Sequence, residues 1–358
     1  MKEHSIAVIG GDGIGPEVTA EAMKVIQAAG EVFGFSVRLT EYPFGTQYWI
    51  DNGKDVIFPE SAFSEVKDMD AVYLGAIGDP RAPVGMIEYG IIAKMRFDLD
   101  LYVNLRPIKL YDERLCPLKD KGPKDVDMVI VRENTEDAYT GMHGFAHKGH
   151  ANEVATQTMV YTRQGVERVI RYAFDKARER GGRKQVTLID KANAVRAHDL
   201  WRRVFAEVAA EYDDCTTDVA YVDAACMWLV KNPEWFDVAV TTNLFGDIVT
   251  DLGAMIQGGM GIAASGNLHP GRVSLFEPIH GSAPKYAGQG GASPVAAIMA
   301  ASMLLDYVGE NEAARVVEDA VADLLISGHL RGVGSGDHRT AEVGDMVSAA
   351  VRATAANV

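Results

Sequence analysis

The feature that most constrains the fold is a repeated pattern in which a short apolar strand ends in polar residues and a helical stretch follows. Residues 127–131, 185–189, 218–223 and 236–240 have the composition of such strands. In an open parallel sheet, ligands bind at the edge formed by the carboxyl ends of the strands. The pattern therefore predicts an α/β fold with a mainly parallel sheet and a site at that edge.

Length and charge narrow the class of protein. A chain of 358 residues exceeds the usual size of one hydrophobic core, which favours two domains or one large α/β domain. The net charge of −15, without a long run of Lys and Arg, argues against nucleic-acid binding. The longest apolar run, residues 295–305, is far shorter than the ~20 residues that span a bilayer. We therefore expect neither nucleic acid nor a membrane as a partner.

The cysteines and the N-terminus indicate a cytoplasmic protein. Cys116, Cys215 and Cys226 are scattered and odd in number, which fits free thiols in a reducing compartment. The chain enters a strand pattern at residues 5–9, with no secretory or transit signal before it. We expect a cytoplasmic location on these grounds.

A glycine-rich loop follows this first predicted strand and precedes a predicted helix at residues 17–29, which Gly30 should stop. The glycines fall as G-x-G-x-G at residues 11–15, and Pro16 occupies the place of the last glycine of a Rossmann fingerprint. The loop thus predicts a tight strand-to-helix turn near a ligand rather than a Rossmann dinucleotide site. Towards the other end, residues 311–326 have the period of an amphipathic helix.

Three arginines stand at predicted strand or helix ends: Arg96, Arg106 and Arg132. The planar fork of arginine recognises carboxylates bidentately, and a small polycarboxylate would need several converging arginines. Taken singly, surface ion pairing in this acidic protein is the simpler explanation. The arginines alone therefore leave both interpretations open.

Asp247 and Asp251 lie four residues apart in a segment that otherwise has the composition of a buried helix. Like charges at this spacing share one helix face and repel mildly, so the pair calls for a cation. The alternative is a solvated acidic edge with an apolar back. Lys191 directly follows an apolar strand, where it either acts as a general base or caps an exposed loop.

Several longer motifs together carry a resemblance that covers nearly the whole chain. They are GDGIGPE (11–17), KMRFDLDLYVNLRP (94–107), VRENTEDAYTG (131–141), DKAN (190–193), NLFGDIVTDL (243–252), GNL (266–268) and FEPIHGSAPKYAG (276–288). With these motifs the sequence resembles the β-decarboxylating dehydrogenase family, which includes 3-isopropylmalate, isocitrate, homoisocitrate, tartrate and D-malate dehydrogenases. NLFGDIVTDL together with EPIHGSAP is highly specific.

The resemblance implies a two-domain isopropylmalate dehydrogenase-like α/β fold with a non-Rossmann dinucleotide site. Residues 1–101 and 258–358 would form a large cofactor-binding domain, and residues 102–257 a smaller central domain with the dimer interface and an arm. It further implies a homodimer with shared active sites that binds a small 2-hydroxy acid, Mg²⁺ or Mn²⁺, and a nicotinamide dinucleotide.

The resemblance also assigns roles to single residues. Arg96, Arg106 and Arg132 would clamp the substrate carboxylates. Asp247 and Asp251, with Asp223 from the neighbouring subunit, would hold the metal. Lys191, also from the neighbour, would be the base on the hydroxyl, and Tyr139 the acid that protonates the enol. The residues implied at the cofactor are Ile14, Asn193, Glu277, His280, Gly281, Ser282, Ala283, Lys285, Tyr286 and Ser293.

The segment before the first clamp arginine bears on the substrate. Ile91 and Ile92 stand where 3-isopropylmalate dehydrogenases carry leucines, and an apolar wall suits an isopropyl group better than a third carboxylate. Glu88 is also of the isopropylmalate type, although its spacing to Arg96 is one residue longer than in some members. We therefore expect oxidative decarboxylation of (2R,3S)-3-isopropylmalate to 2-oxoisocaproate with NAD reduction, in leucine biosynthesis. The alternatives are an isocitrate, tartrate or D-malate enzyme, or a non-catalytic regulatory subunit, which would lack some of the site residues present here.

The preference between NAD and NADP stays open, with NAD favoured. Lys285 and Tyr286 depart from the Asp that typically follows SAP in NAD-using members and resemble NADP-dependent isocitrate dehydrogenase. The Tyr and Arg that would bind the 2′-phosphate further on correspond to Ala341 and Asp345, and an aspartate opposes a phosphate.

Overall fold

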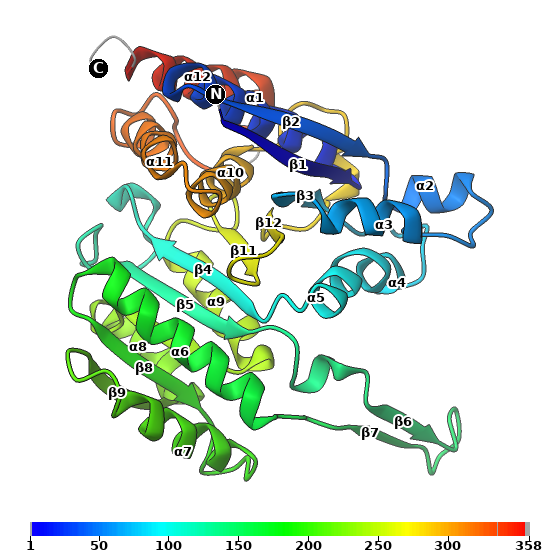
Figure 1. Ribbon diagram of the computed structural model, residues 1–358, viewed down its shortest axis with the longest axis vertical. Coiled ribbons are helices and arrows are strands. Elements are labelled where there is room, and N and C mark those ends of the chain that lie inside the picture. Colours follow the sequence, from blue (N-terminus) through cyan, green and yellow to red (C-terminus); the bar gives the residue numbers. More distant parts are fainter. Residues whose placement is uncertain (1, 335, 355–358) are drawn as a thin grey trace. The chain divides into compact units, whose positions relative to one another are not determined.

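The chain forms two compact units in the computed structural model, which describes residues 2–334 and 336–354 (Figure 1). Unit 1 contains the residues up to Leu101, then Lys109–Pro123 and the residues from Ala254 onward. Unit 2 contains Tyr102–Ile108 and Lys124–Gly253. Among the described residues, no helix combines the length and apolarity that crossing a bilayer requires.

Unit 1 is built on a mainly parallel sheet. Its strands lie in the order β2, β1, β3, β12, β11. The pairs β1–β2, β1–β3 and β3–β12 are parallel, whereas β11 and β12 are antiparallel. The strands are β1 (Lys2–Gly11), β2 (Phe35–Tyr42), β3 (Ala71–Ala76), β11 (Ala264–Leu268) and β12 (Ser274–Pro278).

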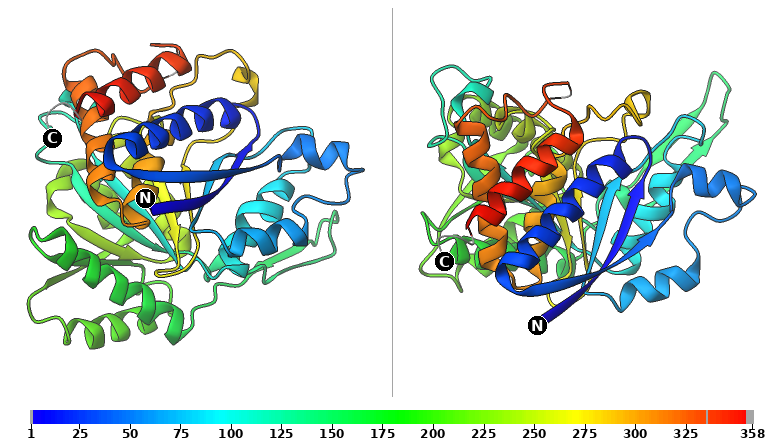
Figure 2. Two further views of the ribbon diagram at one scale, coloured as in Figure 1. Left: turned by 45° about the horizontal axis from the view of Figure 1, so that its top comes forward. Right: turned by 90° about the horizontal axis from the view of Figure 1, so that it is seen from above.

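Two groups of helices accompany this sheet. Helix α1 lies beside α12 and α10, and α10 contacts β11 and β12 (Figure 2, right). A second group covers a core cluster that includes Phe63, Ile87 and Met95 together with residues of β1 and β3. The helices are α1 (Gly15–Phe33), α2 (Thr46–Asp51), α3 (Glu60–Lys67), α4 (Met86–Glu88), α5 (Lys94–Asp98), α10 (Val295–Tyr307), α11 (Asn311–Ile326) and α12 (Thr340–Thr354), with short 3₁₀ turns at Glu113–Leu115 and Pro284–Tyr286.

The sheet strands of unit 2 lie in the order β4, β5, β10, β8, β9, and the pairs β5–β10, β10–β8 and β8–β9 are parallel. Helices α6 and α7 pack on each other and on the strands β5, β10 and β8. Strands β6 and β7 form a separate antiparallel hairpin, which projects as an arm in Figure 1. The strands are β4 (Val103–Lys109), β5 (Asp127–Glu133), β6 (His143–Ala146), β7 (Val154–Gln157), β8 (Gln185–Asp190), β9 (Thr216–Tyr221) and β10 (Val238–Thr241).

The helices of unit 2 connect these strands and place polar residues beyond the strand ends. They are α6 (Arg163–Arg180), α7 (His198–Ala209), α8 (Val222–Lys231) and α9 (Asn243–Ile256), with 3₁₀ turns at Ala138–Thr140 and Pro233–Trp235. The predicted α/β architecture with a mainly parallel sheet is therefore confirmed. Asp223, predicted to close a strand at residues 218–223, lies instead in the first turn of α8.

Two short segments differ from the expected domain bounds. Residues 109–123 and 254–257, expected in the central domain, belong to unit 1. Residues 109–123 contact α11 of this unit: the Tyr111 hydroxyl donates to Glu318 Oε1 at 2.9 Å, and the Arg114 guanidinium donates to the carbonyl oxygen of Leu325.

The predicted stop of the first helix at Gly30 is wrong. Helix α1 continues through Gly30 to Phe33 and ends at Gly34, whose left-handed φ of 76° closes the helix with a bond from its N–H to Gly30 O. Gly30 is a glycine for another reason, because a Cβ there would lie 2.8 Å from the carbonyl oxygen of Phe35. Helix α11, by contrast, begins and ends where the sequence predicts it.

Candidate active site

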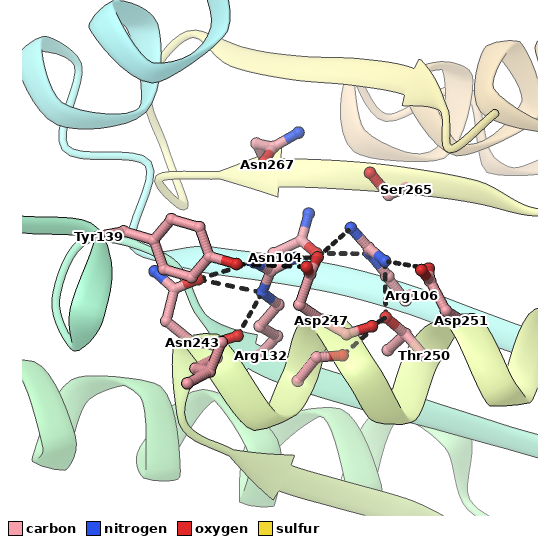
Figure 3. Close-up of polar contacts among 12 residues, drawn as sticks. Asn104, Arg106, Arg132, Tyr139, Asn243, Asp247, Thr250, Asp251, Ser265 and Asn267 are labelled. Atoms are coloured by element: carbon pink, nitrogen blue, oxygen red, sulfur yellow. Dashed lines mark hydrogen bonds and ion pairs between the residues drawn. The ribbon is translucent and has the colours of Figure 1, made fainter. Parts of the chain in front are cut away.

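Asp247 is the centre of a polar cluster in unit 2 (Figure 3). Its Oδ1 accepts a hydrogen bond from Arg132 Nη1 at 2.6 Å, and its Oδ2 accepts one from the Tyr139 hydroxyl at 3.2 Å. Asp247 lies in α9, Arg132 is near the end of β5, and Tyr139 belongs to the 3₁₀ turn Ala138–Thr140. Arg132, a predicted clamp residue, and Tyr139, the predicted acid, thus both donate to Asp247, a predicted metal ligand.

Arg132 is held rigidly. Its side chain is 1% exposed, its Nε donates to the backbone oxygen of Asn243 at 2.8 Å, and its Nη2 donates to Asn243 Oδ1 at 2.8 Å. Gly246 is required beside it, because a Cβ at this position would lie 2.3 Å from Arg132 Cγ. The guanidinium is therefore fixed in orientation before any ligand arrives.

Arg106 joins the same cluster from β4. Its Nε donates to Asn104 Oδ1 at 2.7 Å and its Nη1 to Thr250 Oγ1 at 2.6 Å. Its nitrogens also lie 3.9 Å from Asp247 Oδ1 and 3.7 Å from Asp251 Oδ1. The structure thus brings Arg106, Arg132, Tyr139, Asp247 and Asp251 together (Figure 3). The sequence predicted no role for Asn104, Asn243 and Thr250, because only tertiary contacts reveal that they hold the arginines.

Asp247 and Asp251 present carboxylate oxygens on one face of α9, as the spacing predicts. Their side chains are 43% and 53% exposed, so both can reach a ligand. Burial raises the pKa of Asp251, Arg106 opposes this shift, and Asp247 adds to it. Two hard oxygen donors with mutual repulsion fit Mg²⁺ or Mn²⁺. Within residues 2–334 and 336–354 no three side chains of one chain gather as a metal-binding group, so Asp223 does not join the pair within the chain.

Asp223 instead pairs with Lys191. Lys191 Nζ donates to Asp223 Oδ1 at 2.6 Å, and this bond lowers the pKa of the Asp223 carboxyl. Lys191 follows β8, and its backbone N–H donates to His198 Nδ1 at 3.0 Å. The predicted base and the predicted third metal ligand are therefore neighbours. The sequence did not single out His198.

The third predicted clamp arginine lies in unit 1. Arg96 Nε donates to Asn267 Oδ1 at 2.9 Å, and Arg96 Nη2 donates to Glu277 Oε1 at 3.3 Å. Asn267 in turn donates to Glu277 Oε1 at 2.8 Å, and its side chain is fully buried on β11. Glu277, implied at the cofactor, is thus in contact with the clamp arginine. The GNL motif was the sequence signal for Asn267.

The segment implied at the substrate lies N-terminal to Arg96. Ile91 is 0% exposed and packs in the core cluster, whereas Ile92 is half-buried at its edge. Of the two predicted wall residues, only Ile92 therefore has surface available to a ligand in this structure. Glu88 points towards Gly78, where an added Cβ would lie 2.9 Å from Glu88 Oε1 and 3.8 Å from Ser282 Oγ.

The residues implied at the cofactor centre on two contacting loops of unit 1. The Ile14 N–H donates to the carbonyl oxygen of Ser282 at 2.8 Å. Gly13 permits this approach, because a Cβ there would lie 1.9 Å from the same oxygen. The loop with His280, Gly281, Ser282 and Ala283 is thereby fixed against the glycine-rich turn after β1, and burial lowers the pKa of His280.

Each of the remaining cofactor candidates lies within one of the two units. Lys285 and Tyr286 are exposed, with the ammonium 4.7 Å from the centre of the tyrosine ring. The Ser293 hydroxyl accepts from the Val295 N–H at 3.4 Å at the start of α10. Asn193 is exposed in the turn after β8 of unit 2.

The fold and these clusters define a two-unit α/β dehydrogenase. The chain belongs to the isocitrate/isopropylmalate dehydrogenase family, whose model matches residues 5–347. This family in general depends on NAD and a divalent metal. The family and the α/β fold inferred from the motifs are confirmed.

Individual relatives agree with this assignment. The chain is 47% identical to the 3-isopropylmalate dehydrogenase of Thermobifida fusca over 96% of each chain, and 46% identical to that of Nocardia farcinica over 97% of this chain and 99% of the relative. Among solved structures, the isocitrate dehydrogenase of Methylococcus capsulatus superposes with a TM-score of 0.87 at 36% identity, covering 98% of this chain and 99% of the other.

Proposed function

We propose that this protein catalyses the metal-dependent oxidative decarboxylation of (2R,3S)-3-isopropylmalate to 2-oxoisocaproate with reduction of NAD, in leucine biosynthesis. The observation that carries the proposal is the cluster around Asp247, which receives both Arg132 and Tyr139 and has Arg106 and Asp251 beside it. The names of its relatives support the substrate.

In this proposal Arg106 and Arg132 bind one substrate carboxylate and Arg96 binds another. Each arginine already donates to a fixed acceptor of its own unit, namely Asn104, Asn243 and Asn267. Side chains held in this way lose little freedom when the substrate binds. The half-buried Ile92 and the nearby Glu88 would face the substituent at C3, and an apolar surface there favours an isopropyl group.

Asp247 and Asp251, with the partner's Asp223, would hold the metal. Bound there, Mg²⁺ or Mn²⁺ would stabilise negative charge on the C2 oxygen while the neighbouring carboxylate leaves. The partner's Lys191 would take the proton of the C2 hydroxyl, and a bound nicotinamide dinucleotide would supply the acceptor for the C2 hydride. The bond from C3 to its carboxylate then breaks, and CO₂ departs. Tyr139 donates its hydroxyl proton to C3 of the resulting enolate, and the acid is in place because its hydroxyl is already bound to Asp247.

We propose NAD as the preferred cofactor. Asp345 stands where a phosphate-binding arginine would be expected, so this position offers no cation to a 2′-phosphate, and its carboxylate is paired with Lys24 at 2.8 Å. The exposed Lys285 leaves turnover with NADP as a second outcome of the assay. We further propose a homodimer, because the role given to Lys191 and Asp223 requires a second copy. A cytoplasmic location is proposed because the cysteines Cys116, Cys215 and Cys226 are free, as expected in a reducing compartment.

The proposal is tested by following NAD(P)H absorbance with Mn²⁺ on 3-isopropylmalate, isocitrate, D-malate and tartrate, each with NAD and NADP. We expect the highest kcat/KM with 3-isopropylmalate and NAD. Isocitrate as the best substrate would favour the activity named for the similar Methylococcus structure and would overturn the substrate proposal. Absence of turnover on all four would overturn the proposed function.

Asp247→Asn is the single substitution that tests the proposed metal site most directly. It keeps the shape of the side chain but removes the charge that faces Arg132 and the metal. We expect loss of metal-dependent turnover by about 100-fold or more at ordinary Mg²⁺ concentrations. Retained activity under these conditions would exclude Asp247 as a metal ligand, and circular dichroism checks that the variant is folded.

A further inference from the structure

A buried chain of hydrogen bonds runs behind Lys191 in unit 2. The Lys191 N–H donates to His198 Nδ1 at 3.0 Å, His198 Nε2 lies 3.1 Å from the Tyr161 hydroxyl, and that hydroxyl donates to Asp137 Oδ1 at 2.8 Å. His198 and Asp137 are both 0% exposed. Burying a polar group costs free energy unless the group is hydrogen-bonded. This chain of hydrogen bonds is therefore a specific feature of the fold.

The bonds fix the protonation of His198. Because Nδ1 accepts from the Lys191 N–H, the ring proton is on Nε2 and is donated to the Tyr161 oxygen. Tyr161 then donates its own proton in a hydrogen bond to Asp137, so that all donors point one way. Burial lowers the pKa of His198 and Arg202 adds to this shift, while Asp190 and Asp137 oppose it. The imidazole is therefore a neutral acceptor for the Lys191 backbone.

The far end of the chain reaches the Asp247 cluster. Asp137 Oδ1 also accepts from the Ala138 N–H at 2.8 Å, and its Oδ2 accepts from the Leu244 N–H at 2.9 Å. Ala138 begins the turn that carries Tyr139, and Leu244 lies in the first turn of the helix that carries Asp247. Asp137 has a left-handed φ of 69°, which is uncommon for a residue with a side chain and persists only where the surroundings impose it.

We propose that His198 is a positioning residue for Lys191, and that the chain Asp137–Tyr161–His198 holds the Lys191 turn, the Tyr139 turn and the start of α9 in one fixed arrangement. The inference rests on the proposed function for the role of Lys191 as the base. His198 contacts no reacting atom; it sets the direction in which the lysine leaves the end of β8.

Three variants separate this role from simple packing. His198→Leu removes both bonds. His198→Asn keeps an acceptor oxygen close to the place of Nδ1, so it can still bind the Lys191 N–H. Tyr161→Phe removes only the hydroxyl in the middle of the chain. Tyr212→Phe is the matched control, because Tyr212 is another tyrosine of unit 2 whose hydroxyl bonds an aspartate, Asp175, at 2.9 Å.

Two measurements are made on the full chain. The first is hydrogen exchange of the Lys191 amide, which we expect to accelerate in His198→Leu and to stay protected in His198→Asn. The second is the pH profile of kcat for 3-isopropylmalate. We expect kcat to fall about 10- to 100-fold in His198→Leu, with little change in KM. In His198→Asn we expect kcat to recover in large part. Tyr161→Phe should lower kcat less, and Tyr212→Phe should leave it unchanged.

The outcomes are distinct from those of the proposed function. A wild-type protein without turnover would overturn the proposed function, while amide exchange would still decide whether His198 holds the Lys191 turn. Unchanged exchange and unchanged kcat in His198→Leu would overturn the inference. An equal loss of kcat in His198→Leu and His198→Asn would overturn it too, because a bond to Nδ1 predicts rescue. If His198→Leu does not fold, the comparison of Tyr161→Phe with Tyr212→Phe decides, and equal kcat and equal Lys191 exchange in these two variants would overturn the inference.

Discussion

At the scale of single residues, one buried carboxyl group has a property that the sequence motifs do not reveal. Glu133 follows Arg132 in the run RENTE, yet no role was predicted for it. It is 1% exposed, and its carboxylate accepts from the backbone N–H groups of Thr135 and Glu136 at 2.7 and 2.8 Å. Burial outweighs these bonds and raises its pKa from 4.5 to about 7. Glu133 is thus a titrating group inside unit 2.

This shift predicts a dependence of stability on pH. Because the folded pKa is the higher one, the folded protein retains a proton that the unfolded chain releases between 4.5 and about 7. The contribution to stability is complete below 4.5 and is lost as the pH rises through 7, by up to about 3 kcal/mol. Glu133→Gln does not titrate, so we expect its urea midpoint to change less than that of the wild type between about pH 5 and about pH 8. Exposed Glu312→Gln is the control, and an equal pH dependence of the wild type and Glu133→Gln would contradict the prediction.

At the scale of elements, the run from Met86 to Asp98 is a helix with a π-turn at Tyr89–Ala93 between α4 and α5. A π-turn accommodates one extra residue within a helix. It gives a physical account of the spacing from Glu88 to Arg96, which the family resemblance marks as one residue longer than in some members. Gly90 fits the bulge, because a Cβ there would lie 2.7 Å from Ile57 Cδ1.

Deleting Gly90 should convert the π-turn into a regular α-helix, and because the turn accommodates one extra residue, Glu88 and Arg96 should keep nearly the same relative orientation. The side chains inside the turn, Ile91 and Ile92, would change direction, and with them the exposed surface of Ile92. We expect kcat/KM for 3-isopropylmalate to fall about tenfold or more relative to that for D-malate. Deletion of Gly182, in an exposed turn with open space around it, controls for shortening the chain. An unchanged ratio of the two substrates would show that the π-turn has no part in specificity.

The helices also show how much of the structure could be predicted from the sequence. Helix α11 was predictable because its apolar period is regular along its whole length. The end of α1 was not, because Gly30 is a glycine for its contact with Phe35 rather than as a helix stop. The motifs supplied Arg106, Arg132, Tyr139 and Asp247, but His198 and Asp137 act through contacts between residues far apart in sequence. No local pattern encodes such contacts.

At the scale of the whole molecule, the proposed base and third metal ligand of one chain would serve the site of a second copy in the proposed homodimer. Lys191 and Asp223 pair with each other, and the described part of one chain gathers no group of three metal-binding side chains. A site shared in this way makes two different inactive chains able to complement each other.

Mixing Lys191→Ala and Asp247→Asn chains tests the sharing directly. Each variant alone should be inactive. After denaturation and joint refolding in equal amounts, half of the dimers contain one chain of each kind, and in each of these one of the two sites is intact. We therefore expect about one quarter of the wild-type rate. No recovery, with dimers verified by sedimentation, would mean that each chain uses its own Lys191.

The path of the backbone has a consequence for how the protein responds to cleavage. The chain passes between units 1 and 2 at residues 101/102, 108/109, 123/124 and 253/254, so neither unit is a continuous piece of sequence. A protease that cuts the arm between β6 and β7 leaves each fragment with segments of both units. The two fragments remain threaded through the same two hydrophobic cores and stay associated until those cores unfold. A nicked molecule would therefore run as two bands on a denaturing gel and as one particle in native buffer.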